Sequence, residues 1–239
     1  MTPRAALALL ALLAAACSAH PAAAPAPSSP AAPSAAAAAD DGGAVQPASI
    51  ALDRVPASCR TRLPACPNGS SVRAYQVDGG FNVRCETAQR VADGPLAVCD
   101  AAGTLLAIVG IKTNVKDGLT TLYYPSGGKK LEREFADDQA NGWTVEYYEN
   151  GQVSIRAHYV DGRKDGLQTD YTEDGTKRAE GEYRDGVQEG RATLYYANGN
   201  KEREGTFRNG KPDGQFTHWA PDGTVESVTV FRDGVKQSP

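Results

Sequence analysis

Apolar and polar residues alternate in short runs over residues 94–239, and the same pattern returns every 24 residues. Two aromatic columns follow this period, one made of Tyr123, Tyr147, Tyr171, Tyr195 and Trp219, the other of Phe135, Tyr159, Tyr183, Phe207 and Phe231. Glycines follow it in three further columns, which include Gly94, Gly79 and Gly162. A period kept without insertions predicts an array of identical supersecondary units.

Each unit is predicted to be a β-hairpin, because two runs rich in Thr, Val, Tyr and Phe flank an Asn-Gly or Asp-Gly pair. A two-residue type I′ loop is the usual interpretation of that pair. The residues 125–127 and 221–223 favour a three-residue loop instead, because Pro suits a type I turn and Gly suits the left-handed position of a G1 bulge. That loop places Tyr147 opposite Val153 and Val145 opposite Ile155.

This register predicts two different faces. Odd positions carry both aromatic columns together with Leu119, Trp143, Val145 and Leu167, and even positions carry Lys130, Glu132, Glu134, Arg156, Glu180, Glu182, Glu202 and Glu204. One face is then an aromatic ladder and the other is charged. Gly181 and Gly205 lie between strand aromatics, where a neighbouring ring can cover the bare backbone. The predicted fold class is all-β, an elongated single-layer antiparallel β-meander of 24-residue hairpin repeats.

The first 16 residues are typical of a secretory signal, with a basic head followed by 12 residues that are only Ala and Leu. The stretch Leu13-Ala14-Ala15-Ala16-Cys17 resembles the lipobox of bacterial lipoproteins. The resemblance implies cleavage before Cys17 and acylation of its sulfur, and Ser18 after it points to the outer membrane. Ordinary signal cleavage is the alternative.

Residues 17–49 are rich in Ala, Pro and Ser and predict a tether without a core, and residues 50–93 predict an N-terminal cap that contains cysteines and a degenerate repeat. Apart from Cys17, the chain has Cys59, Cys66, Cys85 and Cys99, an even number that suggests two disulfides with three open connectivities. The predicted strand register favours a cross-strand Cys85–Cys99 bridge and leaves Cys59 for Cys66. The spacing does not match a zinc ribbon, so no metal site is expected.

The pattern G-x4-Y-Y-x-N-G followed by Y-x-D-G over residues 94–239 resembles the MORN-repeat variant family, which includes antitoxins of the YwqK type. The resemblance implies the hairpin fold. Its functional implications are broad, because such arrays serve as interaction surfaces, membrane-associated scaffolds and toxin-neutralising partners.

Charge and residue usage narrow the function further. A net charge of −4 argues against nucleic-acid binding. His158 and His218 lie two and a half repeats apart without a nucleophile at a recognisable spacing, so no catalytic residue, enzyme activity or cofactor is expected. Tyr124, Tyr148 and Tyr196 lie on the otherwise polar face, and this makes them the candidate partner-binding residues.

Three classes of function stay open. The favoured one is a lipid-anchored, non-enzymatic scaffold of the cell envelope that binds an unidentified protein. The second is an antitoxin-like or immunity protein that neutralises a toxic partner, and the third is a glycan- or cell-wall-binding module. In each case the protein is expected to be exported and held at the outer membrane by the N-terminal acyl chain on Cys17.

Overall fold

The computed structural model describes residues 49–63 and 65–238. The predicted signal sequence, Cys17 and the predicted tether up to residue 48 lie outside the described residues, so their predicted roles stay predictions. The chain divides into two compact parts, the first ending at Gln152 and the second beginning at Val153, and each is described by itself.

In the first part, short elements precede a series of strands that each pair antiparallel with the next in sequence. The elements are β1 (Ser49–Ile50), the 3-10 helix η2 (Leu52–Arg54), α2 (Ala57–Arg60), β2 (Ser70–Val77), β3 (Gly80–Thr87), β4 (Ala92–Asp100), β5 (Leu105–Lys112), β6 (Val115–Tyr123), β7 (Lys129–Ala136) and β8 (Gln139–Tyr147). β1 pairs with β2.

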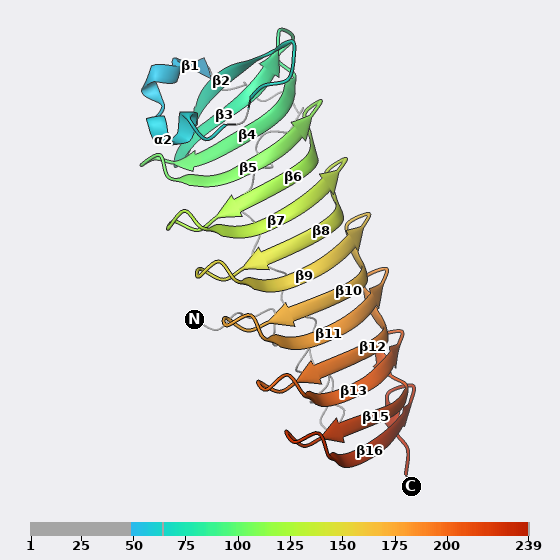
Figure 1. The fold of residues 1–239 in the computed structure, drawn as a ribbon. Coiled ribbons are helices and arrows are strands. Elements are labelled where there is room, and N and C mark those ends of the chain that lie inside the picture. The colour runs from blue at the N-terminus through green and yellow to red at the C-terminus, as the bar shows by residue number, and fades with distance from the viewer. Residues whose placement is uncertain (1–48, 64, 239) are drawn as a thin grey trace. The chain divides into compact units, whose positions relative to one another are not determined.

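The second part continues the same meander order, and in each part Figure 1 shows strongly bent strands in successive hairpins. Its strands are β9 (Val153–Val160), β10 (Arg163–Tyr171), β11 (Lys177–Arg184), β12 (Val187–Tyr195), β13 (Lys201–Arg208), β14 (Lys211–Pro212), β15 (Gly214–Trp219), β16 (Val225–Arg232) and β17 (Val235–Lys236). The described residues thus form seventeen strands in antiparallel order, which confirms the all-β meander.

Two kinds of loop alternate along the meander. In the loop after β6, the Gly127 amide donates to the Tyr124 carbonyl at 2.8 Å, and Gly127 has a φ of 89°. This confirms the three-residue loop with a left-handed glycine. The loop between β9 and β10 is different, because Asp161 and Gly162 both have positive φ, as a type I′ turn requires.

Five of the long-looped hairpins also contain a second bulge that the sequence pattern did not predict. Tyr123 pairs with Lys129, but Leu122 pairs with Leu131, so Lys130 stands opposite no residue. The same shift leaves one extra residue in the other hairpins of this kind, at Leu106, Arg178, Glu202 and Glu226. The first hairpin, β2–β3, lacks it and keeps one register throughout.

The extra residue reverses the predicted faces. Leu119 pairs with Glu134 and Thr121 with Glu132, while Thr120 pairs with Arg133. Since residues directly opposite each other share a face, odd residues before the loop lie with even residues after it. The expectation that Leu119, Trp143 and Leu167 share a packed aromatic face with both columns was therefore wrong, whereas the expected facing of Val145 and Ile155 stays a prediction.

The two aromatic columns lie on opposite faces of the sheet. We call the face of Tyr123, Tyr147, Tyr171, Tyr195 and Trp219 the tyrosine face, and the face of Phe135, Tyr159, Tyr183, Phe207 and Phe231 the phenylalanine face. In the second part the phenylalanine face holds a buried cluster made of Ala179, Ala192, Leu194, Phe207, Phe216 and Phe231. A Cβ added to Gly205 would overlap the Phe216 ring, so a ring does cover this bare backbone, as predicted.

The disulfides pair Cys59 with Cys99 and Cys66 with Cys85, so the expected Cys85–Cys99 and Cys59–Cys66 bridges were wrong. Cys85 and Cys99 do lie in adjacent strands, but Cys99 stands opposite Phe81, four residues from Cys85. Four residues of strand span about 13 Å, beyond the roughly 7 Å limit between the Cα atoms of a disulfide. Both bridges instead hold the segment before β2 against the first strands.

Peptide mapping of the oxidised protein under non-reducing conditions should recover Cys59 linked to Cys99 and Cys66 linked to Cys85. The physical reason is reach, because the bridged Cα atoms lie 6.1 and 5.5 Å apart. A reduced digest is the control. Recovery of a Cys85–Cys99 fragment would contradict the observed register of β3 and β4.

Candidate partner-binding surface

The tyrosine face carries a cluster of three residues that recurs along the array. In the first part, the Tyr147 hydroxyl donates to a Glu132 carboxylate oxygen at 2.5 Å, and the Lys129 ammonium contacts the other oxygen at 2.6 Å. The bulge generates this arrangement, because it brings Tyr147 of β8 onto the face of Glu132 in the neighbouring β7. The Tyr147–Glu132 hydrogen bond therefore joins two strands, while Lys129 and Glu132 pair within β7.

The second part repeats the cluster with two variations. Tyr195 donates to Glu180 at 2.7 Å and Lys177 contacts Glu180 at 2.6 Å, as in the first part. In the next repeat Trp219 replaces the tyrosine, and the Lys201 ammonium lies 5.8 Å from the centre of its ring. Glu204 there accepts from Lys201 at 2.6 Å and from the Thr193 hydroxyl at 3.2 Å.

The clusters shift the pKa values of their members in opposite directions. Burial, followed by the hydrogen bond to the carboxylate, raises the pKa of Tyr147 and of Tyr195 to about 12. Burial alone would raise the pKa of Glu132 and Glu180, but the hydrogen bonds from lysine and tyrosine outweigh it and hold both pKa values below the usual range. The charged glutamate and the neutral tyrosine thus stabilise each other.

The three candidate tyrosines lie at the starts of the long loops, and all are half-buried. The Tyr124 hydroxyl donates to the Tyr147 carbonyl at 2.6 Å in the first part, and the Tyr196 hydroxyl donates to the Trp219 carbonyl at 2.7 Å in the second. Both bonds join the start of one loop to the last residue of a strand 23 residues further along the chain, β8 in the first part and β15 in the second. Tyr124 and Tyr196 therefore have a structural role, and the partner-binding role of all three, including Tyr148, stays a prediction.

Leu119, Trp143 and Leu167 were predicted to lie in a packed face, but they are among the exposed large hydrophobic residues. Leu119 is 50% exposed and Trp143 is 37% exposed in the first part, and Leu167 is 44% exposed in the second. The sequence already indicates this exposure, because Arg191 and Gln215 occupy the position of Leu119 in the later repeats. A position that carries Arg in one repeat and Gln in the next is a surface position in the others.

Polar groups with catalytic potential are dispersed over the described residues. His158 Nδ1 lies 3.0 Å from the Asp165 carbonyl, and His218 Nδ1 lies 3.1 Å from a Glu226 oxygen. Within residues 49–63 and 65–238 there is no group of three or more His, Cys, Asp or Glu that could hold a metal ion. A hollow of about 200 Å³ on the tyrosine face of the second part is lined by Arg191, Glu204, Gly205, Thr206, Gln215 and Thr217.

One buried ion pair belongs to the structure of the first hairpin. Glu86 is buried, accepts a hydrogen bond from the Tyr75 hydroxyl at 2.7 Å and contacts Arg84 at 2.6 Å. The Arg84 guanidinium also lies over the Tyr75 ring. Because these three side chains satisfy one another inside the sheet, they support folding and are unavailable to a ligand.

Comparison with known families identifies the repeats. The MORN repeat family matches residues 180–201 and 204–225, and the MORN repeat variant family matches residues 144–161. No curated protein matches the chain. Among the described residues no helix has the length and apolar character needed to cross a membrane.

Alkaline titration tests the Tyr–Glu clusters. A tyrosine whose pKa is higher in the folded than in the unfolded protein stabilises the fold below about pH 10, and this contribution is lost as the pH rises toward 12. The melting temperature should therefore fall between pH 10 and 12, and less steeply in a double Tyr147→Phe, Tyr195→Phe variant. Phenolate absorbance measures the same ionisation directly, and release of both protons near pH 10 in the folded protein would contradict the clusters.

Proposed function

Because this chain is a MORN-repeat protein, we propose that it is a lipid-anchored scaffold that binds another protein in the cell envelope. The observation that carries the proposal is the tyrosine face, which presents Tyr–Glu–Lys clusters at Tyr147 and Tyr195, a related cluster at Trp219, and half-exposed apolar side chains. Aromatic residues beside exposed apolar ones are frequent energetic anchors in protein interfaces.

Export is supported by the two disulfides. Disulfides persist in oxidising compartments such as the bacterial periplasm and are rare in the cytosol, and here two of them fix the cap. They also disfavour the alternative in which the protein neutralises a toxin inside the cytoplasm. The lipobox-like stretch before Cys17 supplies the anchor.

A macromolecular partner suits the shape of this surface better than a small molecule does. The hairpins expose rows of side chains along their strands. The hollow near Arg191 and Glu204 is shallow and polar. Small-molecule sites are usually concave, largely apolar and larger, at about 300–1,000 Å³. A partner protein can instead contact several repeats at once.

The anchor is tested by Cys17→Ser. The substitution removes the acylated sulfur, so we expect the protein to move from the membrane fraction to the soluble fraction of the cells. Fractionation by ultracentrifugation followed by immunoblotting measures this, with Cys17 unchanged as the control. If the variant stays wholly in the membrane fraction, the lipoprotein proposal fails.

Replacement of Tyr124, Tyr148 and Tyr196 tests partner binding. The triple Ser variant removes three rings and should reduce capture of membrane-extracted partners by the purified protein at least tenfold, or about 1.4 kcal/mol. The matched triple Phe variant keeps the rings but loses the hydroxyls that bond Tyr147 and Trp219, so it reports the structural role alone. Normal capture by a folded Ser variant would show that these rings do not bind the partner.

A further inference from the structure

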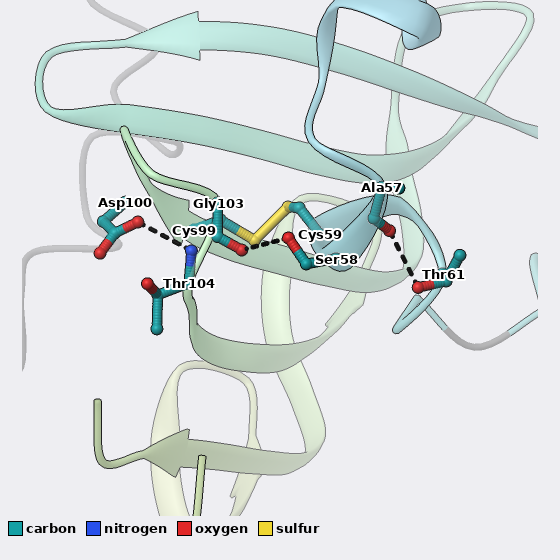
Figure 2. The surroundings of a disulfide bond; sticks show 8 residues. All are labelled: Ala57, Ser58, Cys59, Thr61, Cys99, Asp100, Gly103 and Thr104. Carbon is teal, nitrogen blue, oxygen red and sulfur yellow. Dashed lines mark hydrogen bonds between the residues drawn. A yellow bond between two sulfur atoms is a disulfide. The ribbon is translucent and has the colours of Figure 1, made fainter. Parts of the chain in front are cut away.

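The segment before β2 packs against the tyrosine face of the first hairpins. Val55 and Cys59 from this segment are buried in one cluster with Ala74, Val83 and Cys99 of the sheet. Figure 2 shows the Cys59–Cys99 disulfide and, beside it, the Ser58 hydroxyl that donates to the Gly103 carbonyl at 2.8 Å. The segment is thus packed on the first hairpins and linked to them by disulfides.

Two prolines of this segment cover two glycines of the β4–β5 hairpin. A Cβ added to Gly103, in the loop, would overlap Pro56, and one added to Gly94, in strand β4, would overlap Pro67. Both glycines have positive φ, at 85° and 112°. Since a glycine exposes bare backbone, a flat proline ring can approach it more closely than any other residue type would allow.

The next hairpin has the same features without a cover. Gly118 and Gly127 are in phase with Gly94 and Gly103, and a Cβ added to either would meet no atom within 4 Å. Leu119, next to Gly118, is half exposed. The backbone that binds prolines in one hairpin is therefore open in the adjacent one.

Gly118 is open because of one residue in the neighbouring strand. In β7 and β11 a glutamate lies over the following glycine, so that Glu134 covers Gly142 and Glu182 covers Gly190. The residue in phase with them in β5 is Gly110, which has no side chain to place over Gly118.

Trp143 extends the open surface. It is in phase with Leu119 and lies on the same face in β8, two strands away, which corresponds to about 10 Å. With 37% of its surface exposed it adds an aromatic wall to the apolar Leu119. Aromatic side chains are the usual contacts of proline-containing segments in peptide recognition.

We propose that the tyrosine face of β6–β8, at Gly118, Leu119, Gly127 and Trp143, binds a proline-containing segment of the partner protein. The segment lies over the hairpin with a proline ring on each glycine, as Pro56 and Pro67 lie over Gly103 and Gly94 of β4–β5. This inference rests on the proposed scaffold function and names the chemistry of the partner at one surface. It needs no change in the described fold.

A synthetic peptide tests the proposal. Its sequence copies residues 54–68 with Ser in place of both cysteines, and it is added to the oxidised full-length protein, whose own cap stays bridged. Trp219→Phe makes Trp143 the only tryptophan, so its fluorescence reports binding. We expect a saturable emission change with a Kd below about 1 mM, and at least tenfold weaker binding by a peptide with Gly in place of Pro56 and Pro67.

Variants of the protein locate the site. Leu119→Ser should weaken peptide binding at least fivefold, while Leu167→Ser, the matched substitution in phase with it in the second part, should leave binding unchanged. Both positions are half exposed, and circular dichroism checks the fold of each variant. Equal loss in both variants, or no emission change up to about 1 mM peptide, would overturn the proposal. If the protein captures a partner but does not bind the peptide, this inference is wrong and the proposed scaffold function is unaffected.

Discussion

One unpaired residue in each of five long-looped hairpins determines which side chains share a face. Because side chains alternate along a strand, a single extra residue moves every later side chain to the other side. Lys130, Arg178 and Glu202 are such residues, and each follows the loop by three positions. The bulge therefore separates the two aromatic columns and places Tyr147 and Tyr195 next to Glu132 and Glu180.

The two faces consequently use different means of stabilisation. The phenylalanine face of the second part is sealed by rings, with Phe207 and Phe231 each packed edge-on against Phe216. The tyrosine face is held by charge-assisted hydrogen bonds, which keep the glutamates ionised and the tyrosines neutral. Over the first hairpins, β2–β5, the segment before β2 has that role through the buried side chains of Val55 and Cys59, and two disulfides fix it there.

The repeat, the hairpin and the three-residue loop could all be predicted, because they depend on local signals such as the glycine columns and Pro125. The faces could not, since the second bulge has no glycine or proline to mark it, and Lys130 looks like any surface lysine. The disulfide pairing was predicted wrongly for two reasons. It depended on the assignment of the faces, and the segment before β2 lies outside the repeats, so no repeat pattern predicts its path. The exposed Leu119 could have been found, because Arg191 and Gln215 occupy its column.

The column of Gly110, Glu134, His158, Glu182, Thr206 and Val230 gives otherwise equivalent repeats different surfaces. Where it carries glutamate, the carboxylate lies over the positive-φ glycine of the next strand, and where it carries Thr206 the side chain still contacts Gly214. Only a residue without a side chain leaves such a glycine bare, as Gly110 does for Gly118. The hairpin backbone can thus stay constant for folding while one side chain per repeat decides whether the positive-φ glycine of the next strand is covered or bare.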